Sequence, residues 1–185
     1  TSTKWQLRHG GDVLDAGQGD LRDLRAWVSV LGGLRDSVVS VSRARDDAYA
    51  LGLNEAFDSV SPDQLHFAAS SAAFAGVRNA YEEPNRLGVD RWLALLAIKA
   101  RGEESAVIID VGTACTIDVM DDGQHLGGYI FPGMALARDA LVSNTDKIRF
   151  SKHPEPSISP GTDTAGCVLS GVWLTLLATC QHVID

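Results

Sequence analysis

The chain has 185 residues, of which 45% are hydrophobic and 22% are charged, and its formal net charge is −8. This length allows one domain or two small lobes, and the composition is that of a globular protein. The negative charge argues against a nucleic-acid binder and requires that an anionic ligand be neutralised locally. We expect no signal peptide, because the N-terminus has no apolar segment, and no apolar run that approaches the length of a membrane span. The three cysteines form no C-x-x-C pair, which predicts a reduced cytoplasmic protein without disulfides or zinc.

The first part of the chain predicts strands that alternate with helices. Apolar and polar residues alternate over residues 1–7, which predicts a strand, and a returning strand is expected at 12–16. Apolar residues at three- and four-residue steps predict a helix at 20–31, with Asp20 as its cap. The further expected elements are a strand at 37–41, a helix at 46–57 and a strand at 65–69. This alternation is typical of an α/β layer fold.

The middle of the chain predicts turns followed by a helix. Residues 74–86 have turn chemistry around an aromatic residue, and an apolar helical face begins after Gly88 and ends at Gly102. A polar link follows this helix. We therefore expect an N-terminal lobe at 1–102 and a C-terminal lobe at 103–185.

The stretch at 108–133, IIDVGTACTIDVMDDGQHLGGYIFPG, predicts a strand, a tight turn, a strand, a hairpin and a third strand. Asp122 and Gly123 both tolerate positive φ, which favours a two-residue hairpin turn. The elements expected after this stretch are a helix at 134–141, a proline-containing loop at 151–161 and a long apolar helix at 162–183.

The tight turn of this stretch carries candidate chemistry. Asp110 ends a strand and is followed by a glycine and by Thr113, an arrangement that suits a metal-bound phosphate. The glycine would let backbone N–H groups approach phosphate oxygens, Thr113 would add a hydrogen bond, and Asp110 could hold a cation. The alternative is a β-turn whose Asp and Thr satisfy only the local backbone. D-x-G-T alone is a weak motif and by itself favours this alternative.

A second group of candidate residues surrounds the start of the helix after Gly88. Asp90 and Arg91 fall in its first turn, where the helix dipole favours the acid and opposes the base. Asp90 is therefore either a simple first-turn carboxylate or the acceptor of a substrate hydroxyl, with Arg91 gripping a substrate carboxylate or phosphate. A loose phosphoryl-transfer transition state needs mainly an oriented hydroxyl, which Asp90 would provide.

Two further groups have weaker signals. Lys4 follows three small hydroxyl residues and could contact nucleotide phosphates, although an exposed strand lysine is the commoner case. Residues 161–164, Gly-Thr-Asp-Thr, lead into a helix, where a helix cap and a ligand-binding role are about equally expected.

Three motifs together resemble those of type III pantothenate kinases: DVGTACTID at 110–118, GGYIFPG at 127–133 and YEEPNRLGVDR at 81–91. The resemblance implies a member of the acetate and sugar kinase/Hsp70/actin superfamily, with two actin-like (ribonuclease H-like) α/β lobes and a nucleotide cleft between them. It implies phosphorylation of the terminal hydroxyl of pantothenate by ATP, the first step of coenzyme A biosynthesis. It further implies a cytoplasmic homodimer that uses Mg²⁺ and a monovalent cation, K⁺ or NH₄⁺.

The resemblance also implies residue roles. The implied proton acceptor is Asp90, and the implied ligand of the monovalent cation is Asp110. The implied pantothenate-binding residues are Tyr81, Gly88, Val89, Asp90, Arg91 and Thr164. The implied ATP-binding residues are Thr1, Ser2, Thr3, Lys4 and Thr113.

The chain departs from the family pattern at both ends. The family's first phosphate loop reads D-x-G-N-x-x-x-K, of which only the last part is present, and the family continues past Asp185. Both ends therefore look trimmed. One alternative is a non-catalytic nucleotide-binding regulator, like the relatives described as transcription accessory factors. Another is a superfamily kinase for a sugar or an acid, against which the segment at 81–91 argues.

Overall fold

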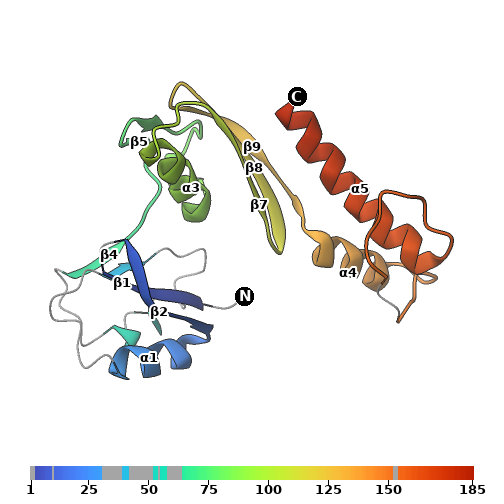
Figure 1. The fold of residues 1–185 in the computed structure, drawn as a ribbon, viewed down its shortest axis with the longest axis horizontal. Coiled ribbons are helices and arrows are strands. Elements are labelled where there is room, and N and C mark those ends of the chain that lie inside the picture. Colours follow the sequence, from blue (N-terminus) through green and yellow to red (C-terminus); the bar gives the residue numbers. More distant parts are fainter. Residues whose placement is uncertain are drawn as a thin grey trace. The chain divides into compact units, whose positions relative to one another are not determined.

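The computed structural model describes residues 3–9, 11–30, 39–41, 52–53, 55–57, 64–151 and 154–185. The fold is mixed α/β, as predicted, and forms two compact units, Thr1–Ala69 and Ser70–Asp185, each of which is described by itself (Figure 1). The candidate residues Thr1 and Ser2 and most of the predicted helix at 46–57 lie outside the described residues.

The first unit contains two pairs of strands and one long described helix. The antiparallel pair is β1 (Thr3–His9) and β2 (Asp12–Gly19), and the parallel pair is β3 (Val39–Val41) and β4 (Leu65–Phe67). Helix α1 (Leu21–Val30) begins after Asp20, whose Oδ1 accepts the backbone N–H groups of Arg22 and Asp23, so the predicted cap is confirmed. The buried core of this unit consists of Leu24, Val28, Leu53, Ala56 and Phe57.

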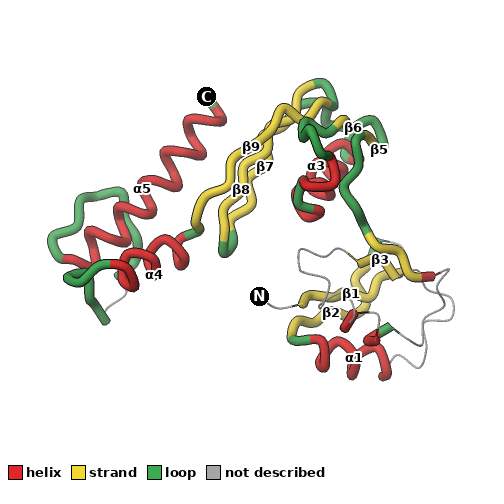
Figure 2. Tube along the Cα trace, turned by 180° about the vertical axis from the view of Figure 1, so that it is seen from behind, coloured by secondary structure: helices red, strands yellow, loops and turns green. Residues whose placement is uncertain are grey.

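The second unit is organised by a five-stranded sheet in the order β5-β6-β9-β8-β7. Its long strands form an antiparallel meander, drawn in yellow in Figure 2: β7 (Ala106–Val111), β8 (Ala114–Asp121) and β9 (Gln124–Pro132). The turn between β8 and β9 has φ of 49° at Asp122 and 69° at Gly123. The strands and the hairpin turn predicted for 108–133 are thus confirmed.

Two short strands at the sheet edge were not predicted. β5 (Ala73–Phe74) and β6 (Val77–Arg78) form a hairpin, and Arg78 of β6 pairs in parallel with Gln124 of β9. The sequence shows only the turn between these strands, where Ala75 and Gly76 have positive φ. Two-residue strands are too short for an alternating pattern to be recognised.

Helix α3 (Val89–Ala100), preceded by the 3-10 turn η2 (Pro84–Arg86), packs on one face of the sheet against β6, β7 and β8. The buried core of this unit consists of Val77, Leu87, Trp92, Leu95 and Met120. Because α3 packs on the meander, the contacts divide the chain after Ala69 and not at residue 102. The lobe boundary at 102 stays a prediction.

The last two helices, α4 (Met134–Asn144) and α5 (Thr164–Ile184), follow the meander and pack against each other. By length and composition α5 could cross a membrane: its most apolar window has a mean hydropathy of 1.6, and 17% of that window is buried. The prediction that no apolar run approaches the length of a membrane span is therefore wrong. Length and composition alone are weak evidence, since the core helices of water-soluble proteins satisfy the same test.

Candidate functional site

The side chains of Asp90 and Arg91 differ sharply in exposure at the first turn of α3. Asp90 is exposed, and its Oδ1 accepts the backbone N–H of Arg91 at 2.9 Å. Gly88 precedes the helix, and a Cβ at this position would come within 2.6 Å of the same carboxylate oxygen. Glycine here therefore leaves room for the Asp90 carboxylate, while Arg91 is only 6% exposed.

Arg91 makes a bidentate ion pair with Asp118 of β8. Its Nε lies 2.8 Å from Oδ2 and its Nη2 lies 2.6 Å from Oδ1 of that carboxylate, which is 2% exposed. Its Nη1 donates to the hydroxyl of Tyr81 at 3.0 Å. The guanidinium thus binds groups of the protein itself, and a role for Arg91 in gripping a ligand carboxylate stays a prediction.

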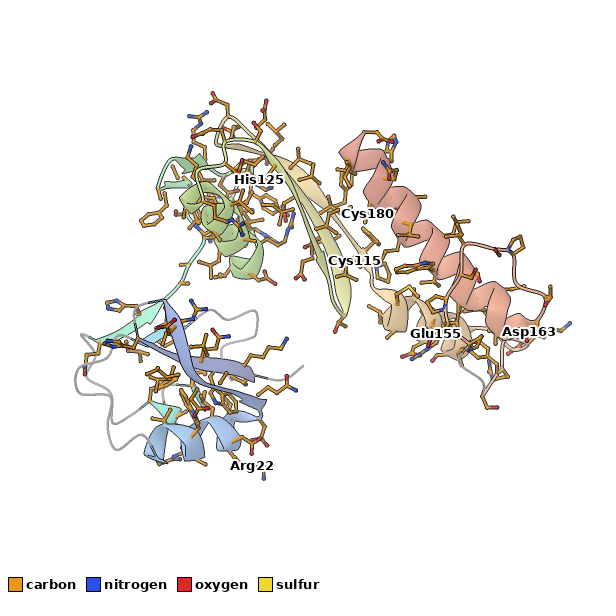
Figure 3. The ribbon with its side chains drawn as sticks, in the orientation of Figure 1. Arg22, Cys115, His125, Glu155, Asp163 and Cys180 are labelled. Atoms are coloured by element: carbon orange, nitrogen blue, oxygen red, sulfur yellow. The ribbon has the colours of Figure 1, made fainter. Side chains whose placement is uncertain are left out.

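His125 completes this buried group. Its Nε2 lies 2.9 Å from Oδ1 of Asp118, its exposed fraction is zero, and its ring stacks on that of Tyr81 with centroids 6.3 Å apart. Figure 3 labels His125 beside α3, at the end of the meander that carries the β8–β9 turn. We call Tyr81, Arg91, Asp118 and His125 the buried quartet. Reasoning from the sequence missed Asp118 and His125 as functional candidates, although Asp118 is a carboxylate between the apolar residues Ile117 and Val119.

A β-bulge in β9 brings His125 to the face of Asp118. Asp118 pairs with Gly128 and Met120 with His125, so two steps along β8 correspond to three along β9. Since successive side chains of a strand point to opposite faces, the extra residue moves His125 to the face that Asp118 occupies. Gly127 at this bulge has φ of 119°, which favours glycine.

The neighbouring Gly128 lets the ion pair approach the strand. A Cβ on Gly128 would lie 2.7 Å from Nη2 of Arg91, 2.9 Å from Oδ1 of Asp118 and 2.1 Å from the backbone oxygen of Ile117. Only a residue without a side chain leaves this space. The two glycines that begin the GGYIFPG motif therefore have separate structural roles.

The buried charges stabilise each other. Burial by itself would raise the pKa of Asp118, but the hydrogen bonds from His125 and Arg91 and the charge of Arg91 outweigh it and lower this pKa. Burial likewise opposes the charge of Arg91, yet the bond to Asp118 and its negative charge leave the pKa of the guanidinium raised. Both side chains are therefore charged at neutral pH.

Asp110 lies on the sheet face that α3 covers. Asp110 pairs with Thr116, and Ile108 pairs with Asp118 two residues further along β8. Directly opposite residues share a face, as do residues two apart, so Asp110 and Asp118 point to the same side. The structure thus places Asp110, which is exposed, on the face where Arg91 anchors the first turn of α3.

Thr113 is exposed in the turn between β7 and β8, and β9 supports this turn. The backbone N–H of Gly133 donates to the backbone oxygen of Thr113 at 2.9 Å. A Cβ on Gly133 would come within 2.0 Å of the backbone oxygen of Gly112. The last glycine of GGYIFPG is therefore required for the close packing that holds the candidate phosphate turn.

The remaining candidates lie elsewhere in the two units. Thr164 is exposed at the start of α5, and the side chain of Asp163 caps this helix by accepting the Gly166 N–H at 2.7 Å, which confirms a cap in this segment. Thr3 and Lys4 lie on β1 of the first unit, where Lys4 is exposed and opposite Gln18. Their roles in binding ATP stay predictions, as does the role of Val89 at the start of α3.

An apolar groove of about 490 Å³ lies between the meander and the last two helices, and no predicted site residue lines it. Phe131 of β9 lines it and pairs with Cys115, which is on the opposite face of the sheet from Asp118. Figure 3 shows Cys115 and Cys180 on this side, and burial raises the pKa of the Cys115 thiol. The groove and the buried quartet are thus on different faces.

The described fold and site define an α/β protein with an exposed acid at a helix start and a second acid on the sheet face beneath that helix. A family profile described as type III pantothenate kinase matches residues 25–185. The chain belongs to the type III pantothenate kinase family, and the resemblance seen in its motifs is confirmed.

Individual relatives agree with this family. A type III pantothenate kinase of Pseudomonas putida is 38% identical, over 90% of this chain and 72% of its own length. One from Acinetobacter baumannii is 42% identical over 64% of this chain, which spans 48%, about half, of that relative. A solved structure from Campylobacter jejuni, described as a Baf family transcriptional activator, has a TM-score of 0.62 at 16% identity, over 91% of this chain and 71% of its own. At this identity the structure supports only the fold.

Proposed function

We propose that the full-length protein transfers the γ-phosphoryl group of ATP to the terminal hydroxyl of pantothenate, the first step of coenzyme A biosynthesis. The observation that supports this proposal most directly is the family match over 25–185, a range that includes the three motifs at 81–91, 110–118 and 127–133. The exposed carboxylate of Asp90, at a helix start fixed by a buried ion pair, is the group that would act on the hydroxyl.

Asp90 would accept the hydrogen bond of the substrate hydroxyl and receive its proton as the new O–P bond forms. A loose phosphoryl-transfer transition state requires little base strength but accurate orientation of the hydroxyl. The first turn of α3 would supply that orientation, because the Arg91 backbone N–H holds Oδ1 of Asp90, Gly88 leaves room for the carboxylate, and the helix terminus favours its negative charge. Tyr81, Gly88, Val89, Arg91 and Thr164 are the residues we propose for pantothenate binding.

The residues proposed for cation and nucleotide binding offer mainly oxygen atoms as ligands, which Mg²⁺ prefers. Among the described residues no group of three or more His, Cys, Asp or Glu side chains is placed to hold a metal ion. Mg²⁺ keeps several waters and binds few protein carboxylates, and Asp110 is the residue we propose for the monovalent cation. Bound cations would neutralise phosphate charge, which a chain of net charge −8 needs. Thr113 and the segment at 1–4 are proposed for ATP.

We further propose two actin-like lobes, 1–102 and 103–185, with the nucleotide between them, in a cytoplasmic homodimer that binds neither nucleic acid nor membranes. The parallel pair β3–β4 and the meander β7–β8–β9 are elements that such lobes contain, and the fold likeness at a TM-score of 0.62 supports the proposed arrangement.

A coupled assay of ADP release by the full-length protein tests this function. We expect turnover that requires both ATP and pantothenate, and the phosphorylated product should appear in proportion to ADP. ATP binding without turnover would support the non-catalytic regulatory alternative, in which the fold only senses a ligand. Turnover with a sugar or a short acid in place of pantothenate would support another kinase of the superfamily.

A further inference from the structure

Asp118 and His125 have none of the roles proposed above, yet they are among the most buried polar side chains described, at 2% and 0% exposure. Replacing a buried ion pair with apolar residues of similar volume is often neutral or stabilising. The Arg91–Asp118 pair is therefore not explained by stability alone. The bulge in β9 and the two glycines beside it, Gly127 and Gly128, place these side chains together.

The donor and the acceptor of each hydrogen bond in the buried quartet follow from the chemistry of its side chains. An ionised carboxylate only accepts, so Nε2–H of His125 and two N–H groups of Arg91 donate to Asp118. Arg91 has donors only, so at Tyr81 the phenol oxygen is the acceptor. The hydroxyl hydrogen of Tyr81 consequently points away from Arg91 and is available to donate to another oxygen.

The quartet also connects the two elements that flank the proposed substrate site. Arg91 follows Asp90 in the first turn of α3, and Tyr81 lies in the segment before that helix. Asp118, on the middle strand of the meander, binds the guanidinium of Arg91, which belongs to α3 and donates to the Tyr81 hydroxyl. A displaced Asp118 carboxylate would therefore displace the Arg91 guanidinium and, with it, the Tyr81 hydroxyl.

We propose that Asp118 and His125 are positioning residues: through Arg91 they fix the Tyr81 hydroxyl as a hydrogen-bond donor to substrate. This inference rests on the proposed function. His125 acts by donating from Nε2, which leaves the Asp118 carboxylate no freedom to rotate away from Arg91.

Substitutions of His125 in the full-length protein separate positioning from packing. Glutamine places its amide nitrogen near the position of Nε2 and keeps the donor to Asp118, whereas asparagine places it near Nδ1, and methionine fills the volume without any donor. Loss of one charge-assisted hydrogen bond should reduce kcat/KM for pantothenate by about tenfold or more in H125N and H125M. H125Q should retain activity within about threefold, and the KM for ATP should be unchanged in all three.

A double-mutant cycle with Tyr81→Phe gives the second readout. If His125 acts through the Tyr81 hydroxyl, H125M should have little further effect on kcat/KM in the Tyr81→Phe background, whereas independent packing effects would add. Exposed Asp121, which lies on β8 with Asp118 and is bonded to Ser105, is the site for a neutral control, Asp121→Asn. Circular dichroism and thermal unfolding establish that each variant is folded at the assay temperature.

The outcomes are distinguishable. An active parent with equal kcat/KM in H125Q, H125N and H125M, or with additive effects in the cycle, would overturn the positioning role and leave the proposed function intact. A parent without pantothenate-dependent turnover would contradict both. If H125M does not fold, the comparison of H125Q with H125N tests the proposal: a lower kcat/KM in H125N supports the positioning role, and equal values overturn it.

Discussion

Arg91 and Asp118 connect α3 to the centre of the sheet through two parallel hydrogen bonds, Nε to Oδ2 at 2.8 Å and Nη2 to Oδ1 at 2.6 Å. Both side chains are more than nine-tenths buried. The pair therefore holds the first turn of α3, which presents Asp90, against β8.

Removing the Asp118 charge should strongly destabilise the protein. In Asp118→Asn the buried guanidinium loses its counter-charge, and an amide N–H₂ faces the donors of Arg91 or His125, so we expect a loss of about 3–5 kcal/mol. Urea unfolding measures this difference. Asp121→Asn on the same strand, whose carboxylate is exposed, should change the free energy by less than about 0.5 kcal/mol. Equal effects at the two positions would contradict the role of the ion pair.

The same pair predicts a dependence of stability on acid pH. The pKa of Asp118 is lower in the folded than in the unfolded protein, so its contribution is fully present above the unfolded value of about 3.9 and is lost as the pH falls through the folded value. Below about pH 4 the unfolding free energy of the parent should fall more steeply than that of Asp118→Asn. Parallel curves from pH 6 to pH 2, measured by urea unfolding, would show that Asp118 does not titrate in this way.

Gly128 should not tolerate a methyl group. In Gly128→Ala the new Cβ would meet the Ile117 carbonyl and the Arg91 guanidinium, and the required shift should cost about 1–3 kcal/mol. The matched control is Gly171→Ala in α5, where nothing lies within 4 Å and alanine should be neutral or stabilising by up to about 1 kcal/mol. Thermal unfolding compares the stabilities of the two variants. A Gly128→Ala protein as stable as the parent would show that β9 can shift to accommodate the Cβ without cost.

The sequence predicted most of the long elements because their patterns are local. The meander follows from apolar runs with an Asp-Gly turn, and α3 follows from a helical apolar face. The buried quartet could not be predicted, because its bonds span 27 residues between Arg91 and Asp118. The bulge adds a second obstacle: a regular strand would place His125 on the other face, and only the register of β9 shows otherwise.

Arg91 shows the same limit at a residue that was identified. The sequence indicated an unusual base in a helix first turn, and a ligand anion was the partner expected for it. The structure shows that a carboxylate from a distant strand binds this base, which the sequence did not indicate, and the ligand role of Arg91 stays a prediction. Residue type and position identified Asp90 and Arg91 as candidates, but exposure alone separates them, and exposure depends on the packing of α3.

Asp90→Asn tests the proposed proton acceptor. Asparagine retains an oxygen that can accept the Arg91 backbone N–H, and the side chain is exposed, so the free energy of unfolding should change by less than about 0.5 kcal/mol. Loss of a positioned proton acceptor should reduce kcat by about 10²- to 10⁴-fold. Steady-state kinetics of the full-length protein measure this, and near-parental turnover would remove Asp90 from the mechanism.

Asp110→Asn tests the proposed cation site. Loss of the carboxylate should raise the concentration of K⁺ or NH₄⁺ needed for half-maximal activity by about tenfold, the effect of one charged ligand. Asp122→Asn, in the exposed β8–β9 turn, is the control and should leave this concentration unchanged. An identical cation requirement in Asp110→Asn and the parent would place the ion elsewhere.

The most direct measurement is the identity of the product. The full-length protein is incubated with pantothenate and ATP carrying a labelled γ-phosphate, and the products are separated and analysed by mass spectrometry. We predict that the label appears on pantothenate, on its terminal hydroxyl, and that Asp90→Asn slows this transfer by about 10²- to 10⁴-fold. Label that remains in ATP, or that is released only as inorganic phosphate, would contradict a pantothenate kinase.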